Sequence, residues 1–541
     1  MITKNIKFFF ISHFLLGSIF LPLFGMSQES SLEKGWNAFY ENKISESRTF
    51  FTEALKDKKD LPEAFLALSF LATIDKTSSE AFINFKKFYE NSSNPQPYLL
   101  ALWNSPCVFE WYDKKSNDQI SFLNKLVDED QFDGSVKALA LSMLGYQYET
   151  KGDHETSIST FNQLKTIDNW QVVGEFENVS GSGFDKQNGP ITVSDNATFI
   201  NKFGAEVSWF PHSSRRDKWV DLEYSFAFNE SIVYAQTFVE SQEDKEVQLR
   251  IGTSGSLKAW VNDQLVISDE EEKNNDLDTY IIKIKLHKGF NRILLQLGES
   301  EIGRMNFMVR ITNEKGESLN GLKVSNATQL YSKEISYNPQ VINLLTEEYF
   351  KKAIKDNPKE LVNYIVLVEA YLKNGKYLDA KRTINDAQKI APKCSYLFNK
   401  LAKIYLKEDN KTLYDETISW VKEKDPNNPE ALHYIFDEQI EKKEFKKAQE
   451  VLGKLEELYG SSESIAKKKV ELSKADKTQA EQIKIINEAF QKFPDSYSIL
   501  ELKYFSVKEN PIKGIELLKK YLQNNYHVFI EEELAQLYLR N

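Results

Sequence analysis

Cysteine is almost absent from this chain of 541 residues, which contains only Cys107 and Cys394, far apart in the sequence. Two thiols exclude the disulfide framework of a small exported domain, and no paired-cysteine spacing for zinc is present. We therefore expect two small buried thiols that lie in different structural units.

Histidine is also scarce, with 6 residues in the whole chain. No two histidines beyond residue 28 are close in sequence, and metalloprotease, nucleophile-elbow and phosphate-loop motifs are missing. Cys107 follows Pro106 in an aromatic stretch and Cys394 opens a helix, so neither has the setting of a nucleophile activated by histidine and an acid. The sequence predicts no enzyme, no cofactor and no metal centre.

One acidic run is a candidate metal site. Asp269 to Glu272 is followed by Asp276 and Asp278, and several carboxylates of this kind can bind calcium. Three adjacent glutamates, however, point in divergent directions. We favour a solvated loop that keeps the edge of a hairpin from pairing with other chains.

Long hydrophobic runs are missing except at the start of the chain. Phe8–Phe24 is apolar, follows two lysines and precedes small and polar residues. This is the layout of a secretory signal peptide, whereas a membrane span needs about 20 apolar residues. We expect residues 1–28 to be cleaved, leaving an exported protein, periplasmic or secreted, with no membrane span.

Basic charge is in deficit as well. The net charge is −11, and removal of Lys4 and Lys7 with residues 1–28 changes it to −13. No basic residues cluster into a stripe, so nucleic acid is excluded as an expected partner.

The last third of the chain, in contrast, has a strict internal period. Helix breakers recur every 34 residues, the period of the tetratricopeptide repeat. They are Pro358, Pro392, Pro426, Gly460 and Pro494.

With these breakers counted as position 32, positions 24 and 27 are apolar in every repeat, which predicts one packed face on each second helix. These residues are Phe350, Ile384, Ile418, Leu452 and Ile486, with Ala353, Ala387, Val421, Leu455 and Ala489. We assign residues 346–541 to a C-terminal tetratricopeptide array.

The N-terminal part has the same signature less regularly. Gly35, Phe51 and Ala54 fit positions 8, 24 and 27, and Gly145 with Phe161 begins a better copy. Residues 29–168 are therefore expected to form an irregular helical array.

Between the arrays the period changes to two. Alternating runs such as Val247 to Ile251 and Tyr280 to Leu286 are typical of strands in an antiparallel sandwich. Asn262-Asp263 joins two of the runs and suits a tight turn. We place the β-sandwich at residues 169–315 and a linker at 316–345.

Several segments here resemble a known family. Trp170 to Asn178, Gly255 to Asn262 and Leu286 to Leu295 are similar to the galactose-binding-like jelly-roll sandwich of bacterial secreted proteins. The order of parts resembles the N-terminal region of exported Bacteroidetes proteins that continue into a transglutaminase-like domain. The resemblance implies a multidomain fold in which an α-solenoid flanks the sandwich, and it implies glycan binding in some members only.

Candidate binding residues follow from the two folds. First helices line the concave face of such arrays, where Asn399 and Lys403 lie one turn apart and His433 and Asp437 occupy the equivalent places one repeat later. In the sandwich, Trp209, Trp219 and Trp260 are candidates for a sugar-stacking platform, and Trp260 is the best of them because it alternates away from the core-facing residues.

The leading functional hypothesis is a non-catalytic exported scaffold that binds protein or peptide partners through its repeat surfaces. The sandwich is then a spacer or a weak glycan contact. The alternatives are the non-catalytic N-terminal part of a transglutaminase-like enzyme, and a carbohydrate-binding protein.

The end of the chain carries one more expectation. Residues 528–541 fit a first helix, with Leu534, Ala535 and Tyr538 at positions 7, 8 and 11. Apolar residues on more than one side of this helix predict an exposed apolar patch.

Overall fold

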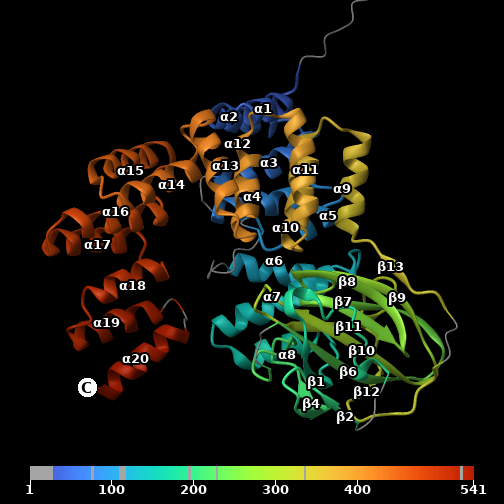
Figure 1. The fold of residues 1–541 in the computed structure, drawn as a ribbon. Coiled ribbons are helices and arrows are strands. Elements are labelled where there is room, and N and C mark those ends of the chain that lie inside the picture. Colours follow the sequence, from blue (N-terminus) through green and yellow to red (C-terminus); the bar gives the residue numbers. More distant parts are fainter. Residues whose placement is uncertain are drawn as a thin grey trace, which may run out of the picture.

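The computed structural model describes residues 29–74, 78–105, 107–108, 117–192, 197–226, 230–333, 337–523, 525 and 528–540. The expected signal peptide, residues 1–28, lies outside the described residues. Within them the chain forms helices, then a large antiparallel sheet region, then helices again (Figure 1).

Eight helices precede the sheet region in the described part of the chain. They are α1 (Ser31–Tyr40), α2 (Ile44–Ala54), α3 (Leu61–Ile74), α4 (Ser78–Asn91), α5 (Gln96–Leu102), α6 (Asn117–Val127), α7 (Gly134–Thr150) and α8 (His154–Asn162).

Two of these helix pairs repeat one contact. In α1–α2 and again in α7–α8, a glycine lies flat against a phenylalanine ring, because a Cβ on Gly35 would come within 2.4 Å of Phe51 and one on Gly145 within 2.3 Å of Phe161. A serine hydroxyl from the second helix also donates to each glycine carbonyl, at 2.9 and 2.8 Å. These glycines and phenylalanines are the residues that the irregular repeat pattern singled out.

The sheet region spans residues 169–342. Its strands are β1 (Asn169–Glu177), β2 (Thr198–Ile200), β3 (Glu206–Ser208), β4 (Phe210–Ser213), β5 (Val220–Asp221), β6 (Ser231–Ser241), β7 (Lys245–Val261), β8 (Gln264–Asn274), β9 (Tyr280–Leu286), β10 (Gly289–Glu299), β11 (Asn306–Thr312), β12 (Lys323–Ser325) and β13 (Gln340–Ile342), with short 3-10 helices η1 (Val179–Gly181) and η2 (Gly189–Ile191).

The long strand β7 organises the sheet. Its first half pairs with β9 and β11, and its second half pairs with β8 and β10, all antiparallel. The alternating residues of these strands, such as Leu249, Ile282 and Leu295, are fully buried in one apolar core. Asn262 and Asp263 have positive φ angles of 50° and 66° at the β7–β8 turn, as their residue types predicted.

The segment 316–345 differs from the expected linker. β12 pairs with β6 and β13 pairs with β9, so the segment belongs to the sheet. Strands of three residues are too short to show an alternating pattern, which is why the sequence did not reveal them.

The final helices follow the predicted period. They are α9 (Leu345–Asp356), α10 (Leu361–Lys373), α11 (Tyr377–Ile390), α12 (Ser395–Lys407), α13 (Lys411–Lys424), α14 (Pro429–Glu441), α15 (Phe445–Tyr459), α16 (Glu463–Asp476), α17 (Gln479–Lys492), α18 (Tyr497–Phe505), α19 (Pro511–Leu522) and α20 (Val528–Arg540). Of the ten residues at positions 24 and 27, all but Ala353 are buried, and Ala353 is half-buried. The predicted packing face is therefore confirmed.

The last helix exposes part of its apolar surface. Ile530 and Leu537 of α20 are buried, whereas Tyr538 and Leu539 are exposed. The described part of this helix therefore keeps exposed apolar side chains, and the expected contiguous patch stays a prediction.

The N-terminal helices and the first C-terminal repeats share one hydrophobic core. α5 packs against α9 and α10, and the Tyr98 ring meets Phe350 edge-on at 5.0 Å. By its stripe α9 is the second helix of a repeat, and the helix that packs beside it comes from before the sheet region. The expected two arrays are therefore joined into one.

A buried charge cluster fastens the sheet to this array. The Arg250 guanidinium, 1% exposed, donates to Asp133 at 2.8 Å and to Ser135 at the start of α7. Asp278 accepts from Ser135 at 2.8 Å and forms an ion pair with Arg310. Burial alone raises the pKa of Asp133, but hydrogen bonds from Arg250 and Ser135 outweigh it and hold that pKa below its ordinary value.

We expect Arg250→Met to lower stability by about 3–5 kcal/mol at pH 7, because it removes a buried cation from the half-buried Asp133 and the buried Asp278. A carboxyl with a lowered folded pKa stabilises the fold above its unfolded pKa of about 3.9 and loses that contribution as pH falls through the folded value. The difference between variant and parent should therefore shrink below about pH 4. Urea denaturation midpoints at pH 7 and at acidic pH measure this.

The matched control is Lys283→Met, which removes an exposed ion pair with Glu246 on the same sheet. It should change the midpoint little. An equal shift at both pH values for Arg250→Met would contradict the role assigned to Asp133.

Candidate functional site

The concave face of the array changes along its length from covered to open. We define the concave stripe as positions 5 and 9 of α10, α12, α14, α16 and α18. Its residues are Ile365, Asn399, His433, Lys467 and Glu501, with Glu369, Lys403, Asp437, Glu471 and Phe505.

Exposure rises steadily along this stripe. Ile365 is 2% exposed, Asn399 and His433 are half-buried, and Lys467 and Glu501 are exposed. At position 9 the Glu369 side chain is 12% exposed, whereas Lys403 reaches 58%. The first part of the concave face is therefore occupied within the molecule, and the part beyond Asn399 is accessible.

The chain's own N-terminal helices form the cover. Phe39 of α1 and Phe70 of α3 place their rings 5.6 and 6.4 Å from that of Tyr396 on α12. Asn42, in the α1–α2 turn, donates from Nδ2 to the Lys393 carbonyl at 2.8 Å and accepts the Ser395 backbone N–H at 2.9 Å. These two hydrogen bonds join the N-terminal helices to the start of α12.

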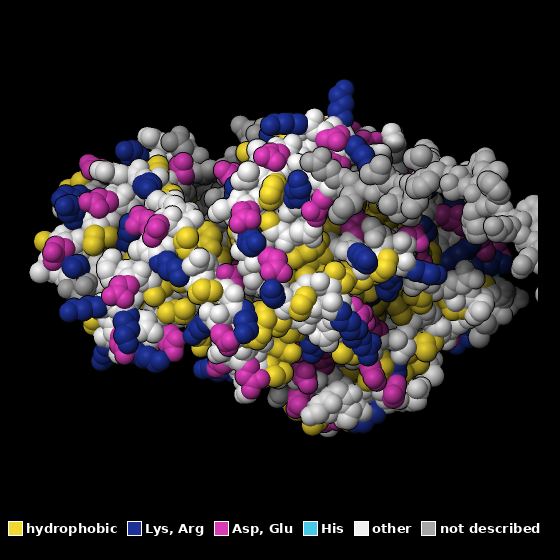
Figure 2. Space-filling model, turned by 90° about the horizontal axis from the view of Figure 1, so that it is seen from above, with side chains coloured by type: hydrophobic (Ala, Val, Ile, Leu, Met, Phe, Trp, Pro, Cys, Tyr) yellow, Lys and Arg dark blue, Asp and Glu magenta, His cyan; other side chains and the backbone are white. Residues whose placement is uncertain are grey.

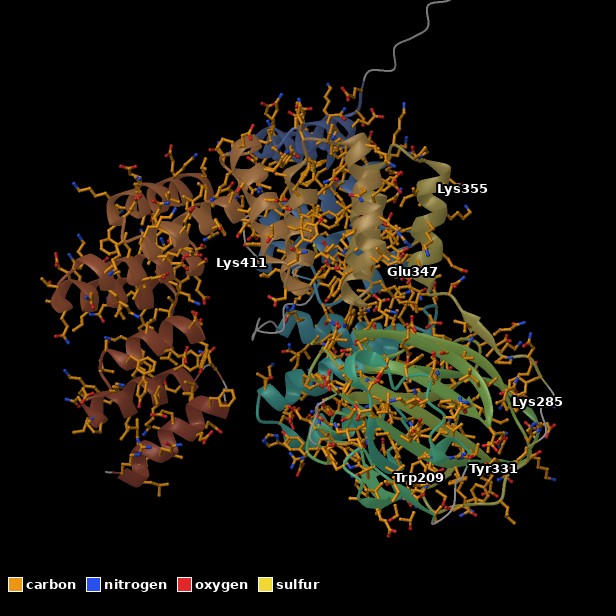
Figure 3. The ribbon with its side chains drawn as sticks, in the orientation of Figure 1. Trp209, Lys285, Tyr331, Glu347, Lys355 and Lys411 are labelled. Atoms are coloured by element: carbon orange, nitrogen blue, oxygen red, sulfur yellow. The ribbon has the colours of Figure 1, made fainter. Side chains whose placement is uncertain are left out.

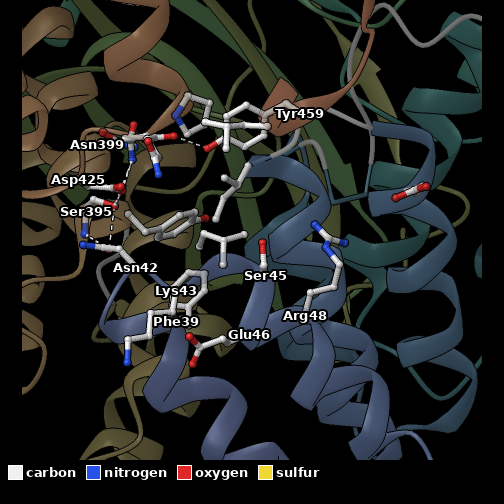
Figure 4. Close-up of a pocket in the computed structure, with 18 residues that line it drawn as sticks. Phe39, Asn42, Lys43, Ser45, Glu46, Arg48, Ser395, Asn399, Asp425 and Tyr459 are labelled. Atoms are coloured by element: carbon white, nitrogen blue, oxygen red, sulfur yellow. Dashed lines mark hydrogen bonds between the residues drawn. The ribbon is translucent and has the colours of Figure 1, made fainter. Parts of the chain in front are cut away.

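A cavity of about 570 Å³ lies where the cover ends (Figure 4). One wall comes from the α1–α2 turn and α2, with Ser45, Glu46 and Arg48, and the opposite wall carries Ser395, Asn399 and Asp425. The complete lining is Phe39, Asn42, Lys43, Ile44, Ser45, Glu46, Arg48, Ile74, Glu80, Ser395, Tyr396, Asn399, Asp425, Asn427, Asn428, Pro429, Leu458 and Tyr459.

A smaller cavity of about 90 Å³ adjoins it and shares Ile74, Tyr396, Asn399 and Pro429 in its lining. Lys403 and Glu430 also line this smaller cavity. Amide, hydroxyl and aromatic groups together give a mixed surface of the kind that suits an extended peptide.

Asn399 is held by a network of side chains. Its Nδ2 donates to Oδ1 of Asn428 at 3.1 Å, and the same oxygen accepts the Ala431 backbone N–H at 3.2 Å as the N-cap of α14. Asn428 Nδ2 donates to Ser395 and Asp425, both at 3.1 Å. The Asn399 Oδ1 atom is buried and accepts no hydrogen bond within the described residues, which costs about 1–3 kcal/mol.

The floor of the smaller cavity holds a buried ion pair between Lys400 and Glu369. Tyr396 donates to Glu369 at 3.3 Å, and the Lys400 ammonium lies 5.0 Å from the Tyr396 ring. Burial by itself lowers the pKa of Lys400, but Glu369 and Tyr396 raise it above its ordinary value, so the Lys400 ammonium stays charged at neutral pH.

Both cysteines are buried and free, as expected, and burial raises the pKa of each thiol to about 12. They lie in the same hydrophobic core and not in different units, because the two arrays are joined. Thiols with such pKa values are poor nucleophiles at neutral pH.

The other predicted partner-binding residues lie further along the open stripe. Asp437 forms an ion pair with Lys468, and Lys403 lies 3.9 Å from Glu430. Only Asn399 and Lys403 of the four predicted residues line the two cavities, and His433 and Asp437 do not. Asn42, Ser395 and Asn428 were missed, although the helix-capping pattern Asp425 to Asn428 was a usable signal.

Trp260 was expected to be an exposed glycan contact, but its ring is buried. It is 7% exposed and packs with Trp209, Tyr234 and Leu294. Alternation correctly placed its ring away from the main sheet core, but the segment after β1 folds over that face. Trp209, on this covering segment, lies at the end of the sheet region far from the array (Figure 3).

The acidic run Asp269 to Glu272 lies within strand β8 and not in the expected solvated loop, and several of its carboxylates have partners. Asp269 accepts from Lys273 at 2.7 Å and from Tyr280 at 2.8 Å, and Glu272 accepts from Ser300 at 2.6 Å. In the part of the chain that the structure describes, no group of three or more His, Cys, Asp or Glu is arranged to hold a metal ion. Acidic and basic side chains are interspersed on the face seen from above (Figure 2).

Residues 346–404 match the profile of the tetratricopeptide repeat family. The C-terminal half carries tetratricopeptide repeats. A search of curated proteins finds no match. None of the described helices is both long and apolar enough to cross a bilayer.

Several solved structures are similar to this tetratricopeptide array. A structure of Pseudomonas aeruginosa pilF is 18% identical, covers 33% of this chain and 84% of its own, and has a TM-score of 0.27. A tetratricopeptide repeat protein from Parabacteroides merdae is 17% identical, with coverage of 36% and 78% and a TM-score of 0.29. Yeast Tom70 is 11% identical, with coverage of 95% and 88% and a TM-score of 0.29.

We expect Asn42→Gly to loosen the cover from the tetratricopeptide array. Asn42 has a φ of 61°, which glycine adopts without strain, so the variant removes only the bonds to Lys393 and Ser395. The loss should be about 1–3 kcal/mol in chemical denaturation. Asp409→Gly, at a φ of 52° in the next turn along the array, is the control and should be near neutral. Equal midpoints for the two variants would contradict a stabilising role of the Asn42 hydrogen bonds to Lys393 and Ser395.

Proposed function

We propose that this protein is a non-catalytic scaffold that holds a protein partner on the open part of its concave tetratricopeptide face. The observation that carries the proposal is the cavity at Asn399, the first position-5 residue of the stripe that the N-terminal cover does not bury. Repeat arrays of this kind offer extended concave surfaces to other chains.

The chemistry of the cavity supports a peptide segment as the occupant. Asn399 and the exposed Asn427 present amide groups, while Ile74 and Tyr396 contribute apolar surface. Amides pair with a peptide backbone whatever its side chains are, and the apolar groups select among side chains. The volume of about 570 Å³ lies within the range of ligand pockets.

The sheet region fits a supporting role in this proposal. The Arg250 cluster fastens it to α7, and Trp260 is covered, so the binding surface that we assign lies on the helices. The thiol pKa values support a non-catalytic chain. If the chain is the N-terminal part of a transglutaminase-like enzyme, the same face would hold the partner of that enzyme.

Peptides selected by phage display against the chain test the proposal. We expect Asn399→Ala and Lys403→Ala each to weaken the selected peptides about tenfold in calorimetry, which corresponds to about 1.4 kcal/mol. Asn385→Ala, an exposed change on the outer helix α11, should leave affinity unchanged. Binding that is insensitive to both groove variants would overturn the proposal.

We also propose that the scaffold is exported, on the basis of the lysine-led apolar segment within residues 1–28. Expression in a bacterial host followed by fractionation and N-terminal sequencing should find the chain outside the cytoplasm and cleaved near Gln28. Recovery of the uncleaved chain from the cytoplasm would contradict export.

A further inference from the structure

The orientation of the Asn399 amide carries a further inference. Of its two polar atoms, Oδ1 is buried, whereas the side chain as a whole is half-buried and lines both cavities. Because Oδ1 is buried, any hydrogen bond from this side chain to an occupant must come from the amide nitrogen, and Asn428 engages one of its two N–H groups.

An asparagine amide can usually rotate to exchange its oxygen and nitrogen. Asn428 prevents this exchange at Asn399. Its Oδ1 must accept the Ala431 N–H to cap α14, so that oxygen faces Asn399 as an acceptor. A rotated Asn399 would place its own oxygen against it, and two acceptors repel.

The orientation of Asn428 is fixed in turn from its other side. Its Nδ2 donates to Asp425 and to the Ser395 hydroxyl, which itself donates to Asp425 at 2.6 Å. A rotated Asn428 would face the Asp425 carboxylate with an oxygen. Asp425 thus fixes the orientation of the Asn428 amide, and the Asn428 amide in turn fixes the orientation of the Asn399 amide.

We propose that Asn428 is a positioning residue that locks Asn399 as a hydrogen-bond donor, so that the occupant must present an oxygen acceptor at this point. The acceptor is a peptide oxygen, either a backbone carbonyl or a terminal carboxylate. Lys403, one turn along α12, adds positive charge on the same side. This inference rests on the proposed binding of a peptide in the groove.

The test uses the tightest peptide from the phage selection on the full chain. A series of its analogues replaces one backbone carbonyl at a time by a methylene, and a further analogue has an amidated C-terminus. We expect one analogue to bind the parent chain about tenfold more weakly than the unmodified peptide does. The affinity of that analogue should be the same for Asn399→Ala as for the parent chain. A sensitive methylene analogue identifies a backbone carbonyl, and a sensitive amidated analogue identifies a terminal carboxylate.

Asn428→Ser tests the positioning role. Serine still caps α14 but is too short to accept from Asn399. The tenfold discrimination should disappear in Asn428→Ser, and an unchanged circular-dichroism spectrum of this variant separates positioning from folding. Asn385→Ala, at an exposed residue of α11 that lines neither cavity, should leave the discrimination unchanged.

The outcomes distinguish this inference from the proposed function. Peptides whose affinity depends on neither Asn399 nor Lys403 would overturn both the proposed function and this inference, and peptides that depend on Lys403 alone would overturn this inference only. Peptides that depend on Asn399 but whose discrimination survives in Asn428→Ser would overturn the positioning role alone. An analogue series in which removal of an N–H, and not of a carbonyl, weakens binding through Asn399 would reverse the assigned direction.

Discussion

The contact between α5 and α9 is the constraint on which the rest of this structure depends. Tyr98 packs edge-on against Phe350, although α6, α7, α8 and the entire sheet region separate the two helices along the chain. Phe350 belongs to the periodic stripe that each repeat buries. A repeat whose two helices come from opposite sides of an inserted region can form only when both parts of the chain are folded together.

This closure determines which surface remains for a partner. Because α1 and α3 arrive with α5, their phenylalanines lie on Tyr396, and Asn42 caps the contact at Ser395. The concave face of the first repeats is thus covered by the chain's own N-terminal helices. The accessible face starts at Asn399, where the covering helices end and the larger cavity begins.

The charge cluster around Arg250 has a related role at the other end of the insertion. Arg250 pairs with Asp133, and both Arg250 and Arg310 pair with Asp278, whose side chain is buried together with the two guanidinium groups, so the sheet and α7 hold one relative arrangement. A hydrophobic contact of similar size would permit sliding, whereas paired buried charges lose much energy when their geometry changes. The sheet region is thereby fastened to the array that carries the cavity.

Much of this architecture followed from the sequence by itself. The 34-residue period located the second-helix stripe, and alternation located the core strands and the turn at Asn262, because helix and strand periodicities are local properties of the chain. The pattern also placed Asn399 and Lys403 on the concave face. It could not show that α5 completes the repeat of α9, that the segment after β1 covers Trp260, or that Asn428 orients Asn399. Those features are contacts between residues far apart in sequence or between side chains of neighbouring elements, and only the tertiary structure decides which of many compatible surfaces meet.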